Sequence, residues 1–176
     1  MTLPLGVDHT PAPVPPASAL TVVVYGDPGP QGSKRPQGRF ADGRPRMVES
    51  SAKVEPWREA VKLAALRARR EDAQITWDEA VTARMVFTFV RPRSHYRTGR
   101  NAHLLRAAAP PRPIGYPDVS KLARSTEDAL TAAAVYRDDA RIVDYTRLAK
   151  VWAGEDPEAL DALGARITIS TLGGPT

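Results

Sequence analysis

Proline distribution constrains this chain more than any other feature of its sequence. Seventeen of its 176 residues are proline, and most of them lie in residues 1–19, 28–45 and 92–117. Because proline lacks a backbone N–H and has a fixed φ, it is excluded from helix interiors and from central strands. Regular structure is therefore expected mainly outside these three segments.

Hydrophobic patterning outside these segments predicts strands and helices that do not alternate regularly. A helix is expected over residues 53–70, where apolar residues recur at spacings of three and four and Pro56 occupies the first turn. The other expected elements are a second helix at 119–134, strands at 21–25, 81–90, 141–152 and 165–171, a hairpin around Asp42-Gly43 returning through 47–49, and a short helix or turn at 156–163. This order predicts an α+β fold with a small mixed β-sheet packed with two main helices.

Composition separates a leader from a folded domain. Residues 1–19 are rich in proline and alanine without periodicity, so we expect a disordered leader, with the domain formed by residues 20–176. No apolar run approaches the roughly 20 residues of a membrane span, and no signal peptide is evident. We therefore expect a cytoplasmic protein that has no membrane partner.

The absence of cysteine excludes several classes of site. A count of zero cysteines removes disulfides, thiolate metal sites and thiol nucleophiles, and three isolated histidines leave little room for a histidine-built zinc centre. Any metal site must therefore be built from oxygen ligands.

The net charge of +5 is unevenly distributed and favours a polyanionic partner. No Asp or Glu lies between Ala80 and Pro117. That stretch instead holds Arg84, Arg91, Arg93, Arg97, Arg100, Arg106 and Arg112, and a second basic cluster holds Lys34, Arg35, Arg39, Arg44 and Arg46. A solvated loop would explain the first stretch as well, but the lack of any acid favours phosphate contacts.

Acidic residues gather around Asp118 and around residues 138–144. Asp118 directly precedes the second expected helix, where it is either an N-cap or a metal ligand. Asp138 and Asp139 precede the next expected strand, where they form either a turn or part of the same site. A helix of about 15 residues is roughly 22 Å long, so Asp118 and Asp139 meet only if the following chain folds back. Such a pair of carboxylates would favour Mg²⁺ or Mn²⁺.

The order of these residues resembles the RusA-type Holliday junction resolvases, which are small dimeric Mg²⁺-dependent endonucleases. The family pattern starts with Asp-x-Asp-Asn/Lys-Leu-x-Lys/Arg, continues with Asp-Ala-Leu inside the helix, and ends with Asp-Asp-x-x-Val. The matching residues here are Asp118, Lys121-Leu122, Arg124, Asp128-Ala129-Leu130 and Asp138-Asp139. The loop at 28–36 resembles the family's proline-basic loop, and the likeness spans residues 21–170.

The resemblance implies roles for particular residues. Asp118 and Asp139 would hold Mg²⁺, with Mn²⁺ as an alternative, and Asp138 would lie beside them. Arg124 occupies the position of the family's catalytic basic residue and would stabilise charge on the scissile phosphate, although it could also pair with Glu127 or Asp128 on its own helix. The expected partner is four-way junction DNA, bound by Lys34, Arg35, Arg91, Arg93, Arg97, Arg100 and Lys121. Paired nicks in a two-fold symmetric junction require two sites, and therefore a homodimer.

Ser120 departs from the family pattern, because it replaces the second motif carboxylate with a neutral hydroxyl. Glu127 falls on the same helix face, but about 10 Å further along the axis. Two hypotheses therefore stay open: an active endonuclease, or a non-catalytic branched-DNA binder derived from one. A structural protein without a nucleic-acid role would leave the acid-free arginine stretch unexplained.

Overall fold

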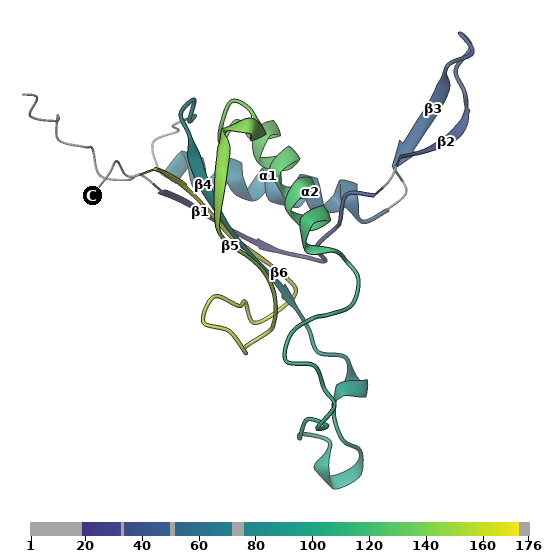
Figure 1. Ribbon diagram of the computed structural model, residues 1–176, viewed down its shortest axis with the longest axis vertical. Coiled ribbons are helices and arrows are strands. Elements are labelled where there is room, and N and C mark those ends of the chain that lie inside the picture. Colours follow the sequence, from purple (N-terminus) through teal and green to yellow (C-terminus); the bar gives the residue numbers. More distant parts are fainter. Residues whose placement is uncertain (1–18, 33, 50–51, 72–75, 173–176) are drawn as a thin grey trace, which may run out of the picture.

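The computed structural model describes residues 19–32, 34–49, 52–71 and 76–172. Its centre is a four-stranded sheet with the order β1-β6-β4-β5 (Figure 1). Both β1 with β6 and β6 with β4 are antiparallel, whereas β4 and β5 are parallel. The strands are β1 (Ala19–Tyr25), β4 (Val81–Phe89), β5 (Ile142–Trp152) and β6 (Gly164–Thr171). This mixed sheet confirms the expected α+β class, and residues 156–163 form turns without a helix.

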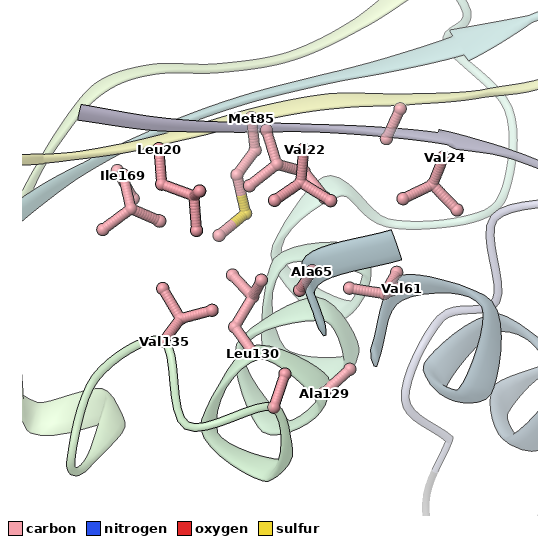
Figure 2. Packing of buried hydrophobic residues seen from close by; sticks show 14 of the residues in the cluster. Leu20, Val22, Val24, Val61, Ala65, Met85, Ala129, Leu130, Val135 and Ile169 are labelled. Atoms are coloured by element: carbon pink, nitrogen blue, oxygen red, sulfur yellow. The ribbon is translucent and has the colours of Figure 1, made fainter. Parts of the chain in front are cut away.

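Two α-helices, α1 (Val54–Glu71) and α2 (Val119–Ala132), pack together against one face of this sheet (Figures 1 and 2). In α1 the buried residues Trp57, Val61 and Ala65 recur every four positions, so they form one stripe. The indole N–H of Trp57 donates to the Thr126 hydroxyl at 3.1 Å, which ties α1 to α2 inside the core. No helix among the described residues is long and apolar enough to cross a membrane.

Alternate residues of each strand supply the sheet side of the core. Leu20, Val22 and Val24 of β1 point toward the helices, which contribute Val61 and Leu130 among others (Figure 2). Each such side chain stabilises the fold by about 1.5–3 kcal/mol on burial. Because Met85 and Phe87 face this core, Arg84 and Thr88, which flank them in the alternation, lie on the other face of β4. There the Leu160 N–H donates to the Thr88 hydroxyl at 3.0 Å, so the turns after β5 cover that face.

The parallel pairing of β4 with β5 determines where the acidic residues lie. A parallel pair needs a crossover that returns from the end of one strand to the start of the next. Here α2 makes that return, so it runs opposite to β5. Asp118 therefore lies at the C-terminal end of β5, whereas Asp138 and Asp139 lie at its N-terminal end.

Two segments project from this body (Figure 1). One is the antiparallel hairpin β2 (Lys34–Arg39) and β3 (Pro45–Glu49), whose turn at Asp42-Gly43 was expected from the sequence. The other is the arm, residues 91–117, which leaves the end of β4 and returns to α2. The arm contains the short 3₁₀ helices η1 (Arg93–His95) and η2 (Gly99–Asn101) and a bridge between Tyr96 and Leu105.

Candidate active site along helix α2

Asp118 occupies the N-cap position of α2 without capping it. Its backbone is extended as in a cap, but its side chain accepts no hydrogen bond from the helix. The carboxylate is 60% exposed and has the Lys121 ammonium 3.3 Å away. Asp118 is therefore available to a ligand.

Lys150 of β5 holds the turn that presents Asp118. Its ammonium donates to the carbonyl oxygens of Gly115 at 2.6 Å and Pro117 at 2.8 Å. Burial lowers the pKa of Lys150, and the nearby charge of Asp118 opposes that shift. Sequence reasoning missed this lysine, because only the folding of β5 beside the start of α2 gives it this position.

A hollow of about 420 Å³ lies beside the first turns of α2 and is lined by Gln31, Gly32, Ser120, Lys121 and Arg124. The loop before β2 forms its other wall, because the Gln31 N–H donates to the Lys121 carbonyl at 2.9 Å. Two cationic side chains therefore share one hollow with Ser120, an arrangement that suits a phosphate group.

Close packing of that loop against the helices depends on Gly29. A Cβ atom at this position would lie 2.1 Å from the Lys53 carbonyl oxygen, so no other residue fits without movement of the backbone. The Ser125 hydroxyl donates to the Gly29 carbonyl at 2.5 Å, which joins the loop to α2. The proline-basic loop is thus built into the site.

Arg124 makes no salt bridge with any residue in the described ranges, and the acid beside it on the helix is engaged elsewhere. Asp128 instead pairs with Arg58 of α1 at 2.6 Å. The structure therefore does not show the expected alternative in which Arg124 pairs with Asp128 on its own helix. Burial raises the pKa of Glu127, and the positive charge of Arg124 partly offsets that increase.

Glu127, in the second half of α2, and Asp139 form an acidic neighbourhood away from Asp118. Burial raises the pKa of Glu127, and the charges of Asp139 and Asp128 raise it further. The Tyr145 hydroxyl of β5 donates to the Glu127 carboxylate. Asp139 begins the 3₁₀ helix η3 (Asp139–Arg141), and the Asp138 carboxylate accepts the Ala140 N–H at 2.9 Å. Asp138 is therefore partly used by its own turn.

The three expected metal ligands are not gathered within one chain. Among the residues that the structure describes, no three Asp, Glu, His or Cys side chains are grouped so that they could hold a metal ion. Glu127, whose pKa Asp139 influences, lies nine residues beyond Asp118 along α2, which is about 14 Å of helical rise. Strand β5 does fold back along α2, which was the condition for Asp118 to meet Asp139. The residue that β5 brings to Asp118, however, is Lys150. The carboxylates of a single chain, as placed here, do not fit a divalent ion.

Arg91, an expected DNA contact, is instead a buried anchor of the arm. Its side chain is 5% exposed and pairs with Glu155. Its guanidinium also donates to the Pro110 carbonyl at 3.0 Å and lies 4.8 Å from the centre of the Trp152 ring. An arginine with these partners is not available to phosphates, so we assign Arg91 to holding the two ends of the arm together.

Arg84 and Arg112 have similar acidic partners, although both come from the acid-free stretch. Arg84 and Arg147 lie opposite each other on β4 and β5 and share Glu158, and Arg112 binds Asp156 at 2.8 Å. Hydrogen bonds from these arginines hold the pKa of both carboxyls below their usual values. This group, which we call the root network, comprises Arg84, Arg91, Arg112, Arg147, Glu155, Asp156 and Glu158.

The remaining expected DNA contacts divide between the arm and the hairpin. Arg93 and Arg100 are exposed and make no salt bridge with a described residue, and the exposed Arg97 donates to the Leu105 carbonyl at 3.3 Å. Lys34 and Arg35 begin β2, but their side chains lie outside the part that the structure describes. Lys121 lines the hollow.

Comparison with known protein families gives one match. The family model for endodeoxyribonuclease RusA matches residues 28–160, which include the early loop, the arm, α2 and the acidic turn before β5. The chain therefore belongs to the RusA endodeoxyribonuclease family, the class of nucleases that resolve Holliday junctions. No curated protein sequence matches the chain significantly.

Proposed function

We propose that this protein is a Mg²⁺-dependent, structure-selective endonuclease that resolves Holliday junctions by paired symmetric nicks in DNA recombination and repair. The observation that carries the proposal is the family match, which covers the motif that the structure spreads along α2. Mn²⁺ is the alternative ion, because both ions prefer oxygen ligands.

The hollow beside α2 supports a role for its two cations. Arg124 and Lys121 line it together, and Arg124 has no competing salt bridge in the described chain. A phosphate seated there would receive charge-assisted hydrogen bonds, and Arg124 would stabilise the charge that develops as the phosphodiester bond breaks. Asp118 and Asp139, with Asp138 beside them, are the proposed metal ligands.

The exposed arginines of the arm support a role in holding the DNA duplex. The arm that carries the exposed residues Arg93, Arg97 and Arg100 projects away from the sheet (Figure 1), so it could reach phosphates that the α2 surface does not. Contacts of this kind set affinity and salt sensitivity without reading sequence. Because a four-way junction has two-fold symmetry, we propose that the protein acts as a homodimer.

A junction assay separates catalysis from binding. Asp139→Asn should bind a synthetic four-way junction as the wild type does, but its nicking rate in Mg²⁺ should fall by at least about 100-fold, because it removes a ligand charge. Asp144→Asn is the matched control: its strand partner Thr82 lies on the face away from the helices. If Asp139→Asn cuts like Asp144→Asn, the role given to Asp139 is wrong.

A non-catalytic branched-DNA binder is the second candidate, and Ser120 is the observation that favours it. A neutral hydroxyl stands at the hollow where the family pattern has a carboxylate. This alternative predicts junction binding without nicking by the wild type. A gain of nicking in Ser120→Asp would then show that a missing ligand limits activity, whereas nicking by the wild type at once rules the alternative out.

A further inference from the structure

The hairpin turn, residues 39–44 between β2 and β3, carries an aromatic side chain in solvent. Phe40 is 55% exposed and is not among the residues of the hydrophobic core or those packed against it. The hairpin that carries it projects from the body of the protein (Figure 1). A single exposed apolar residue is common on protein surfaces, so the meaning of Phe40 depends on its surroundings.

Hydrogen bonds within the hairpin turn hold Phe40 in a closed loop. The Phe40 N–H donates to the Arg44 carbonyl, and the Gly43 N–H donates to the Phe40 carbonyl, both at 2.9 Å. Gly43 has a φ of 84°, which glycine adopts without strain, and the Arg39 guanidinium donates to the Gly43 carbonyl at 2.8 Å. Because the turn is already ordered, a ligand that contacts Phe40 loses little affinity to ordering the chain.

The surroundings of Phe40 are strongly basic. Residues 34–46 contain five Lys and Arg residues and one acid, Asp42. The Arg44 side chain is 84% exposed and lies 3.7 Å from Asp42, an exposed ion pair that holds it only weakly. An aromatic ring among cations suits a ligand that has both negative charge and flat apolar faces. Nucleic acid has both, in its phosphates and its bases.

We propose that Phe40 recognises the branch point of the DNA by stacking on a base that is accessible there, while Arg44 binds a flanking phosphate. This inference rests on the proposed junction-resolving function. Bases inside a duplex are stacked on both sides, so Phe40 can reach one only by opening a base step, which costs free energy. At the centre of a four-way junction the stacking between arms is interrupted. Phe40 therefore gives a physical reason for preferring a junction to a duplex.

The hairpin starts at the candidate active site. Gln31 and Gly32 line the hollow together with Arg124, and β2 begins two residues after Gly32. The six residues of β2 extend at most about 20 Å at 3.3 Å per residue. At 3.4 Å per base pair this length corresponds to about six base pairs. A phosphate in the hollow and a base at Phe40 thus lie within that separation, which links the cleavage position to the branch point.

Binding in EDTA, where no strand is cut, tests the stack apart from the reaction. Fluorescence anisotropy with a synthetic four-way junction and with a linear duplex of the same sequence gives the two affinities. Phe40→Ala should weaken junction binding by about 5- to 100-fold, the range for one base–aromatic stack, and leave duplex binding within about twofold. Phe40→Trp should keep the junction affinity, because indole also stacks. Since Phe40 is exposed, these substitutions should not change the fold.

Arg44→Ala is the matched control, because it removes a cation from the same hairpin turn. It should weaken junction and duplex binding alike and lower the slope of log affinity against log salt by roughly one. Phe40→Ala should leave that slope unchanged. Leu63→Ala, at an exposed apolar position on α1, should change neither affinity.

Photo-cross-linking locates the stacked base. A junction that carries 5-iodouracil next to the branch point should cross-link to Phe40 on irradiation, because this base reacts readily with aromatic rings stacked on it. The same base placed in the middle of an arm should give no cross-link to the hairpin turn. Equal cross-linking at both positions, or none to the hairpin turn at either, overturns the inference.

The outcomes separate this inference from the proposed function. Equal loss of junction and duplex affinity in Phe40→Ala, or no loss of either, overturns the stack even when the wild type nicks junctions. A wild type that neither nicks the junction nor prefers it to the duplex overturns the function, and the inference with it.

Discussion

Arg91 and Arg100 belong to the same arm and have opposite surroundings. Arg91 lies in the root network, buried against Trp152 and paired with Glu155, whereas Arg100 lies near the tip in solvent with no salt bridge to a described residue. Both come from a stretch that holds no acid. The acidic partners of the root come from residues 155–158, which the turns after β5 bring to the arm. Charge counted along the sequence therefore overestimates how many arginines are free to bind phosphate.

The largest effect on stability is expected from loss of Arg91, the buried arginine of the root network. Arg91→Ala removes a buried guanidinium and leaves the Glu155 carboxylate without its donor, while the Pro110 carbonyl keeps only the Trp152 N–H. This loss should reduce the free energy of unfolding by about 1–3 kcal/mol. Urea denaturation measures this change. Arg93→Ala is the control and should stay within about 0.5 kcal/mol of the wild type. Equal stability of both variants would contradict the structural role given to Arg91, because Arg93 has no such role.

Loss of the exposed arginines Arg93 and Arg100 should lower DNA affinity without changing the stability of the fold. Arg93→Ala/Arg100→Ala should weaken junction binding and reduce the slope of log affinity against log salt by roughly two, because each lost phosphate contact accounts for about one. Fluorescence anisotropy over a range of salt concentrations gives the slope. Arg67→Ala, an exposed arginine on α1, should leave it unchanged. A double variant with the wild-type slope would show that the tip does not contact DNA.

The root network should also make stability depend on pH. Its arginines lower the folded-state pKa of Glu155, Asp156 and Glu158 below the usual values of 4.5 and 3.8. A depressed folded pKa gives stability that is present above the unfolded pKa and lost as pH falls through the folded one. Thermal unfolding should therefore show that the protein loses stability as the pH is lowered below about 4.5. The loss should be less steep in Glu158→Gln, which has one such carboxyl fewer. An equal slope in the variant would contradict this.

Glu127 should show a smaller effect of opposite sign. Burial and the charge of Asp139 raise its pKa, so the folded state favours its protonated form. Its ionisation then costs stability as pH rises through the folded pKa, and this cost is present at neutral pH. Glu127→Gln should be more stable than the wild type at pH 7, by less than about 1 kcal/mol, and no more stable at pH 4. A variant that is less stable at pH 7 would show that the carboxylate is held by favourable contacts.

Local patterns predicted the elements of this fold well. The stripe of Trp57, Val61 and Ala65 predicted α1, and Asp42-Gly43 predicted the hairpin, because both signals lie within a few residues of chain. What could not be predicted depends on contacts between distant segments. Three such contacts exist only in the tertiary fold: Lys150 beside Asp118, Glu155 paired with Arg91, and the close approach of the Lys53 carbonyl to Gly29. The separation of Asp118 from Asp139 has the same origin, since it follows from the parallel pairing of β4 with β5.

Mapping of nicks on a four-way junction tests the central claim most directly. With each strand labelled in turn, the wild type in Mg²⁺ should nick two opposing strands at symmetric positions and leave a linear duplex of the same sequence intact. Chelation of the metal should abolish both nicks and preserve binding. Binding without nicks, or equal cutting of the junction and the duplex, would contradict the assignment of this chain as a junction-resolving enzyme.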